Sequence, residues 1–434
     1  MPSLLIKGGR IIDTANDFER VADLLIENGK ITRIADIVRD KAVRTIDATG
    51  MIVCAGFIDL HTHLREPGRE DKETIQTGTA AAAAGGFTSI CPMPNTSPIL
   101  DRQTGLTYIK SVTKDQGVVN VYPIAAITKG SQGENITEYG DLVAQGAIGF
   151  SDDGKPVMNS EIMRVALEYS SMLKVPIMDH CEDENLSKEG MIHEGKVSMK
   201  LGLKGIPSAC ESVIVARDIE LAKYTGGHIH ICHVSSEDSV DLIKTAKKKK
   251  IKVTAEVTPH HLLLNEEALL NFDTNMKMNP PLRTKEDQKA LLKALIDGTI
   301  DVIATDHAPH TDIEKDEVFI EAPFGVIGLE TAFPALYTEL VEKNLLRLNK
   351  LIECLTTNPA SILGIDKGGL SLGASADITI IDPNLEKVVD DNFFQSKSRN
   401  SAFLGKKYKG NIHATIVEGH VVYYEGKIIK GQNY

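Results

Sequence analysis

Short apolar runs alternate with longer amphipathic segments through most of this chain, and this alternation limits its fold more than any other feature. Most of these runs are followed by a stretch with helical periodicity. The eight runs are 54–63, 88–94, 119–128, 147–153, 175–183, 228–235, 252–261 and 301–310. Strands that alternate with helices favour parallel pairing. Eight such units predict an α/β fold, a (β/α)8 TIM-like barrel.

Both ends of the chain differ from this pattern. Residues 1–55 contain β-rich runs separated by turn signals such as Asn28-Gly29, and the end of the chain has the same character around Glu418-Gly419. We therefore expect 1–55 and 371–434 to be the two parts of one small β-sandwich module, flanking a catalytic barrel at 56–370. A length of 434 residues suits a barrel with a smaller attached module.

The charge balance limits the possible partners. The chain has 48 basic and 60 acidic residues, a net charge of −12, which would repel nucleic acid and anionic lipid surfaces. It shows no signal-peptide pattern and no run of 18 apolar residues, and its six cysteines are scattered, as in reduced proteins. We expect a cytoplasmic protein that binds neither nucleic acid nor membrane.

Residues able to bind a metal stand near the C-terminal ends of five of the apolar runs, where barrel active sites lie. His61 and His63 are two apart, so an extended strand directs both to one face. The candidates are His61, His63, Asp152, Asp153, His180, His233 and Asp306. Imidazole and carboxylate ligands without thiolate favour Zn²⁺, although Mn²⁺ or Co²⁺ would also fit.

Two further segments bear on the substrate. Arg65, two residues after His63, is placed to offer a bidentate donor to a carboxylate inside an acidic protein. The charge-rich loop 311–323 follows the eighth run, where barrel enzymes carry substrate-covering loops, but an ordinary solvated loop fits equally well.

Several motifs resemble those of one family. DLHTHLREPG at 59–68 and ATDHAPHTDIEK at 304–315 resemble the two signature motifs of dihydroorotases, and PMPNT, KMNPPLR and APFGVIGLE resemble that family's substrate segments. The likeness extends over essentially the whole chain. It implies a zinc-dependent enzyme that reversibly cyclises N-carbamoyl-L-aspartate to L-dihydroorotate in pyrimidine biosynthesis.

The resemblance also implies a metal arrangement. His61, His63 and Asp306 would hold one zinc ion, and His180 and His233 a second. Much of the superfamily bridges the two metals with a carboxylated lysine at the fourth strand, where this chain has Asp152-Asp153. In this it looks like the bacterial class I enzymes, and alignment of SDDG favours Asp153 over Asp152 as the bridge.

Catalytic and substrate roles follow from the same resemblance. Asp306 would act as general base and acid, which suits a carboxylate beside the attacking water. Asn95 and His310 would assist Arg65 at the substrate carboxylate. The pyrimidine ring would contact Asn279, Phe324 and Gly325.

Two other functions remain open on the sequence. Allantoinases and hydantoinases share the His-x-His barrel, but they resemble the lysine-bridged pattern that is absent here. A non-catalytic homologue could serve only as a scaffold for an aspartate transcarbamoylase, although such proteins typically lose metal ligands. We expect a homo-oligomer, and an active enzyme could still associate with a transcarbamoylase partner.

Overall fold

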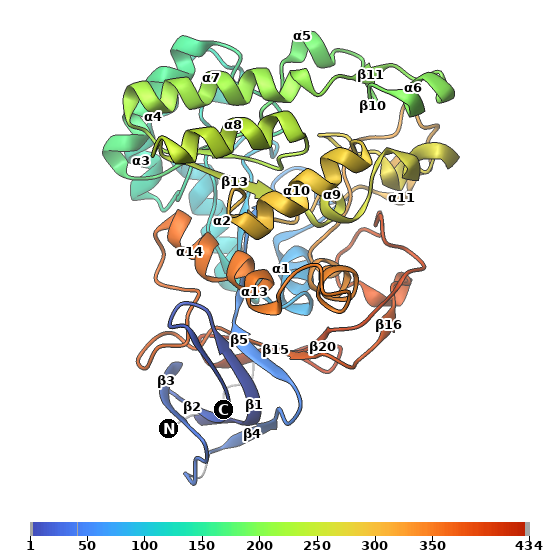
Figure 1. Cartoon of the computed structure of the whole chain (residues 1–434). Helices are drawn as coiled ribbons and strands as arrows, with labels where there is room; N and C mark the ends of the chain where they lie inside the picture. The colour runs from blue at the N-terminus through green and yellow to red at the C-terminus, as the bar shows by residue number, and fades with distance from the viewer. Residues whose placement is uncertain (1–2, 41, 430–434) are drawn as a thin grey trace.

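The computed structural model describes residues 3–40 and 42–429. Figure 1 shows two parts, a large barrel above and a β module below that holds both ends of the described chain. Within the described ranges, no helix is both long and apolar enough to cross a membrane.

The barrel closes through parallel pairing. Its strands are β6 (Phe57–Thr62), β7 (Phe87–Pro92), β8 (Asn120–Val121), β9 (Ile177–Asp179), β12 (Ile229–Ile231), β13 (Val253–Val257) and β14 (Val302–Ile303). The fourth run contributes Phe150, which bridges Ala125 and Ile177 in parallel. A parallel bridge between Thr62 and His307 completes the ring. The expected (β/α)8 fold is confirmed.

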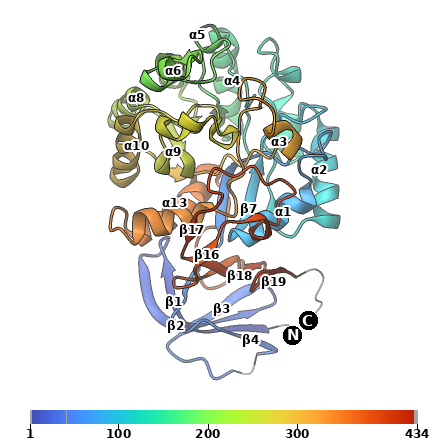
Figure 2. The same cartoon turned by 90° about the vertical axis from the view of Figure 1, so that its right-hand side faces the viewer.

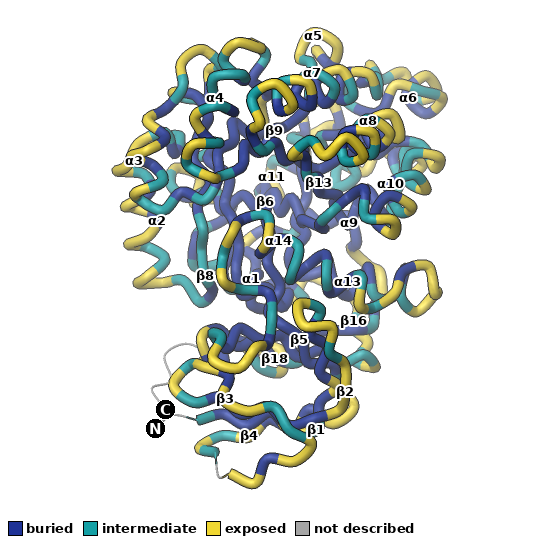
Figure 3. Tube along the Cα trace, turned by 60° about the vertical axis from the view of Figure 1, so that its left-hand side comes forward, coloured by how far each residue is buried: buried dark blue, intermediate teal, exposed yellow. Residues whose placement is uncertain are grey.

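Helices surround this ring. The longer ones are α1 (Ile75–Ala84), α2 (Gln103–Gln116), α4 (Ser160–Leu173), α7 (Ala209–Thr225), α8 (Glu237–Lys248), α10 (Lys285–Asp297) and α13 (Leu348–Leu355). Shorter ones are α3 (Tyr139–Ala144), α5 (Glu184–Ser187), α6 (Lys196–Leu201), α9 (Pro259–Leu263), α11 (Asp312–Lys315), α12 (Ala332–Leu336) and α14 (Thr357–Leu363). Figure 3 shows that buried residues line the interior and exposed ones the outer turns.

Local sequence explains individual helices. In α10 a capping box between Thr284 and Asp287 begins the helix, and Gly298 ends it with a φ of 80° that an L-residue rarely adopts. Leu291 and Leu295 lie one turn apart and bury one face against the barrel. The capping residues therefore set the two ends of α10, and the leucines set which face packs on the barrel.

The β module joins the two ends of the chain in one nine-stranded sheet. The first part supplies β1 (Ser3–Asp13), β2 (Phe18–Glu27), β3 (Lys30–Ala35), β4 (Arg44–Asp47) and β5 (Ile52–Ala55), and the second supplies β15 (Ile378–Asp382), β18 (Asn411–Val417), β19 (His420–Tyr424) and β20 (Lys427–Ile428). The junction is the antiparallel pair of β5 and β15. Figure 2 shows β18 and β19 between β1–β3 and the barrel.

Between β15 and β18 the chain leaves this sheet. Residues 383–410, with the small pair β16 (Lys387–Val388) and β17 (Lys407–Tyr408), lie against the barrel. Phe394 and Phe403 bury their rings in a cluster with Ile327 from the barrel part of the chain. The C-terminal part of the chain therefore supplies residues to the barrel mouth as well as strands to the module.

The candidate active site at the barrel mouth

Six of the predicted ligand residues lie together at the C-terminal mouth of the barrel, and all six are buried. His63 Nε2 lies 3.0 Å from Oδ1 of Asp306. His61 Nε2 lies 3.3 Å from Oδ1 of Asp153, and His180 Nδ1 lies 2.9 Å from Nε2 of His233. Residues up to 245 positions apart thus form one cluster.

Asp153 is central to this cluster, and its neighbour Asp152 is not. The carboxylate of Asp153 lies 3.3–3.7 Å from the nearest ring nitrogens of the four histidines. Asp152 instead accepts hydrogen bonds from the backbone N–H of Thr128, at 3.0 Å, and from the Thr128 hydroxyl. The two adjacent carboxylates therefore face different surroundings.

Three residues reach the cavity through unusual backbone conformations. Arg65, His233 and Asp306 have φ values of 61°, 32° and 48°, in the left-handed region that side chains other than glycine rarely adopt. Such conformations cost on the order of 1–3 kcal/mol each and persist where the surrounding structure enforces them. These conformations turn the chain just after β6, β12 and β14, where the three side chains line the cavity.

The electrostatic field in this cluster favours positive charge. Burial alone would lower the pKa of His61, but Asp153, Glu256 and Asp306 outweigh it and hold that pKa well above its usual value. Burial likewise would raise the pKa of Asp306, yet His61 and His63 keep it well below the ordinary range. A field that favours protons on buried imidazoles also favours a divalent cation among them.

The donor atoms themselves fit a metal. His61 Nε2 and Asp153 Oδ1 are buried and make no hydrogen bond, although they lie 3.3 Å apart. Buried polar atoms without a hydrogen bond cost free energy unless something binds them. His61, His63 and Asp306 present three ligand atoms within 4.8 Å of one another, and so do His61, Asp153 and His233. Imidazole nitrogens and carboxylate oxygens are ligands suited to zinc.

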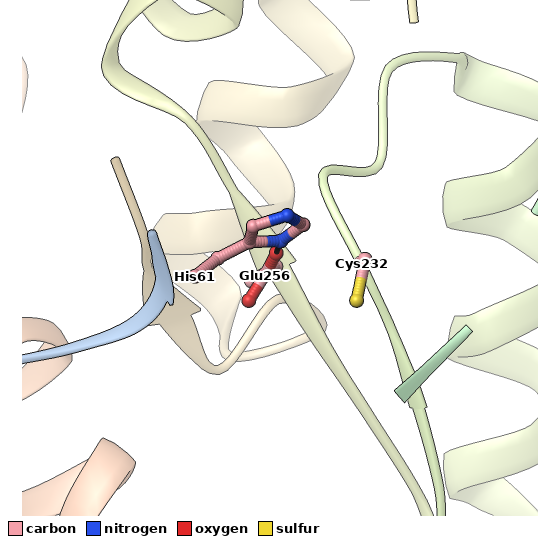
Figure 4. A group of neighbouring side chains, drawn as sticks. All are labelled: His61, Cys232 and Glu256. Carbon is pink, nitrogen blue, oxygen red and sulfur yellow. Dashed lines mark hydrogen bonds and ion pairs between the residues drawn. The ribbon is translucent and has the colours of Figure 1, made fainter. Parts of the chain in front are cut away.

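Two acidic residues that the sequence did not single out hold the histidines in place. Glu256 on β13 accepts a hydrogen bond from His61 Nδ1 at 2.6 Å, and Glu182 lies 2.7 Å from Nε2 of His180. Figure 4 shows Glu256 against the His61 ring, with Cys232 alongside. This trio is a support rather than a second metal centre, because His61 Nδ1 is taken by Glu256 and burial raises the pKa of the Cys232 thiol well above its usual value.

A cavity of about 220 Å³ opens beside the cluster. Each residue expected at the substrate lines it, namely Arg65, Asn95, Asn279, His310, Phe324 and Gly325, and so do five of the six cluster residues, all except His61. Asn95 Oδ1 lies 2.9 Å from Nδ1 of His63, while Asn279 donates to Glu182 at 2.6 Å. Metal-type ligands and substrate-type donors therefore share one space.

The loop 311–323 is organised by two buried lysines. Lys277 donates to the carbonyls of Phe319, Ile320 and Ala322, at 2.7–2.9 Å. Lys315 donates at 3.0 Å to the carbonyls of Pro323 and Gly325. The end of the loop is therefore fixed to the cavity wall by hydrogen bonds to its backbone. The sequence suggested a substrate-covering loop or a solvated loop, and neither expectation included these lysine contacts.

Comparison with known proteins agrees with this geometry. Residues 50–239 match the family described as "Dihydro-orotase-like", and residues 283–423 match the "Amidohydrolase family". A dihydroorotase from Pelotomaculum thermopropionicum is 53% identical over 96% of this chain and 98% of its own, and one from Syntrophus aciditrophicus is 50% identical over 97% and 99%.

Solved structures with the same fold include an L-hydantoinase (dihydropyrimidinase) from Arthrobacter aurescens. It is 26% identical, with a TM-score of 0.89 over 99% of this chain and 98% of its own. The hydantoinase therefore shares the fold at 26% sequence identity, whereas the dihydroorotases share 50–53% of the sequence. On these grounds the chain belongs to the dihydroorotase family.

Proposed function

We propose that the barrel-mouth cluster holds two zinc ions, for the reversible cyclisation of N-carbamoyl-L-aspartate to L-dihydroorotate. His61, His63 and Asp306 would hold one ion, His180 and His233 the other, and Asp153 would bridge them. When bound, the metal lowers the pKa of a water molecule and polarises the amide carbonyl. The atoms His61 Nε2 and Asp153 Oδ1, which are buried and make no hydrogen bond, support this assignment.

Asp306 carries the proton in this scheme. In ring opening its carboxylate takes the proton of the attacking water, the bond between the carbonyl carbon and the ring nitrogen breaks, and Asp306 gives the proton to that nitrogen. Ring closure reverses each step. Two features support this role: the carboxylate lines the cavity, and its lowered pKa keeps it ionised at neutral pH, the form that a base requires.

Recognition of the substrate carboxylate falls to Arg65, assisted by Asn95 and His310. Burial lowers the pKa of Arg65 to about 10, so its guanidinium stays charged at neutral pH. Asn279 and the Phe324-Gly325 backbone would contact the ring. A buried cation beside a general base suits an acidic cyclic amide better than an uncharged hydantoin.

The observation that carries this proposal is one cavity lined by Asp306, Arg65 and three of the four proposed histidine ligands. Its test is turnover of L-dihydroorotate and N-carbamoyl-L-aspartate by the purified chain, with zinc measured on the same sample and allantoin and hydantoin as controls. Activity on the first pair alone is the expected result. Turnover of hydantoin alone would overturn the substrate assignment.

We also propose the bacterial class I subtype, since acidic residues stand at the fourth strand in place of a lysine. The division into a module part at 1–55, a catalytic barrel at 56–370 and a second module part at 371–434 is kept as a proposal, as are a cytoplasmic location and a homo-oligomer. Activity of the purified chain would show that no aspartate transcarbamoylase partner is needed.

A further inference from the structure

His310 at the cavity wall is in contact with Lys72, a residue that the sequence did not single out. Lys72 Nζ lies 3.0 Å from His310 Nδ1, and His310 Nε2 lies 2.8 Å from the carbonyl oxygen of Phe324. Both side chains are only 7% exposed. Lys72 belongs to the loop after β6, whereas His310 follows β14, so the contact joins the first and last strands of the barrel.

This contact sets the position of the ring proton on His310. An ammonium group has donors only, so Nδ1 must accept from Lys72, and a neutral imidazole then carries its proton on Nε2. The carbonyl oxygen of Phe324 accepts that proton, which agrees with the same assignment. Burial, together with the nearby cations Arg65 and Lys72, lowers the pKa of His310 to about 2, so the ring stays neutral.

The fixed proton has a consequence in the cavity. His310 Nε2 lies 3.5 Å from Nη2 of Arg65. With a hydrogen on each nitrogen, these two groups cannot bond to one another, and both border the same cavity. Two N–H groups thus converge on the cavity. The Nε2–H of His310 already has the carbonyl oxygen of Phe324 as one acceptor, and a carboxylate oxygen placed between the two groups can accept from Arg65 and share the His310 proton with that carbonyl.

We propose that Lys72 is a positioning residue, which fixes His310 as an Nε2–H donor and thereby sets the affinity for the substrate carboxylate. The inference rests on the proposed function, because it takes the carboxylate to bind beside Arg65. Lys72 also pairs with Glu314 at 2.8 Å, and that ion pair aims the ammonium at the ring.

The chain offers a matched control in the same loop. Arg69 carries the same charge and also pairs with Glu314, at 3.0 Å, but its link to His310 runs only through that carboxylate, which lies 3.6 Å from Nδ1 of the ring, whereas Lys72 contacts the ring itself. Zinc-loaded Lys72→Met should show a KM for L-dihydroorotate raised about tenfold or more, the scale of one charge-assisted hydrogen bond. Its kcat should stay within about threefold, and Arg69→Met should keep both constants near wild type.

Nitrogen-15 NMR of the histidine rings tests the proton position directly, with the His310 signal identified by its loss in His310→Gln. We expect the neutral Nε2–H form in the wild type and a mixture of both neutral forms in Lys72→Met. An Nδ1–H or doubly protonated ring in the wild type would overturn the proposal, even if Lys72→Met did not fold. So would an unchanged KM in folded Lys72→Met.

Failure of the proposed function is distinguishable from failure of this inference. It would appear as a wild-type chain that turns over no L-dihydroorotate. The ring-proton comparison between wild type and Lys72→Met needs no turnover, so it still decides whether Lys72 fixes His310.

Discussion

Glu256 lies directly behind His61, with one carboxylate oxygen 2.6 Å from Nδ1 of that ring. The other oxygen lies 3.0 Å from Nε2 of His230, whose Nδ1 lies 2.9 Å from the hydroxyl of Thr254. That hydroxyl is in turn 2.8 Å from Nε2 of His228. A polar chain therefore runs from the candidate ligand His61 through the buried Glu256 and His230 to the half-buried Thr254 and His228.

Removing the charge behind His61 should weaken metal binding. Glu256→Gln should lower zinc affinity about 10- to 100-fold, because a carboxylate partner orients a ligating imidazole and raises its basicity. Competition with a chelator gives the affinity without an activity assay. Glu134→Gln, at an exposed glutamate, is the control. Equal affinity in the Glu256→Gln protein would mean that the contact only packs the core.

Neutralising the proposed proton carrier should stop chemistry. Asp306→Asn should reduce kcat about 10²- to 10⁴-fold, because an amide cannot shuttle a proton. Zinc content is measured on the same sample, because Asp306 is also a proposed ligand: turnover lost in protein that still holds zinc identifies the proton role. The exposed Asp316→Asn should behave as wild type. Near-normal turnover in Asp306→Asn would remove the acid-base role.

Asn400 should matter to the site although it lies far away in the sequence. Its Nδ2 donates to the carbonyls of Ala308 and Gly325, at 3.1 and 3.2 Å, and its Oδ1 accepts from the backbone of His310 at 3.1 Å. Asn400→Ala leaves these groups unpaired, so it should cost about 1–3 kcal/mol in the free energy of unfolding.

The same substitution should lower kcat/KM for L-dihydroorotate about tenfold, since Gly325 and His310 line the cavity. Asn392→Ala, at an exposed position of the same segment, is the control for both measurements. Wild-type stability and kinetics in Asn400→Ala would contradict the role given to this segment.

Lys315 should make stability depend on pH. Burial, reinforced by Lys277, lowers its pKa to about 7, against about 10.4 in an unfolded chain. Between these values the unfolded state binds more protons, so the contribution of Lys315 to folding stability rises with pH.

The test compares urea unfolding of wild type and Lys315→Met across that window. The stability difference, wild type minus variant, should rise from pH 7 to pH 10 by at most about 1.4 kcal/mol per pH unit. It should level off below and above that range. A difference that stays flat between pH 7 and 10 would show that the amine keeps its ordinary pKa in the folded protein.

The sequence predicted the barrel and the cluster because both depend on simple regularities. Eight apolar runs indicated eight strands, and the rule that barrel sites lie at strand C-termini selected His61 and Asp306. Strand lengths were less predictable. The eighth run spans 301–310, yet β14 covers only Val302–Ile303, because apolar runs report burial rather than paired backbone. The left-handed turn at Asp306 has no sequence signal.

The supporting residues escaped prediction for a different reason. Glu256 stands in an apolar run, where nothing local shows which histidine its carboxylate will meet. Asn400 bonds to a residue 90 positions away, and no spacing rule reaches that far. Lys72 sits in a charged loop, typical of solvated surfaces. Such contacts emerge only from the tertiary fold.

The sheet shared by the two chain ends bears on how the protein is made. β5 leaves the ribosome more than 300 residues before its partner β15, so its edge waits unpaired while the whole barrel is synthesised. Asn400, which tethers the cavity wall, emerges later still. Pairing over such a sequence distance is slow. A catalytically competent cavity is therefore a late product of synthesis, and an assay of stalled nascent chains should find no turnover until the segment containing Asn400 is free.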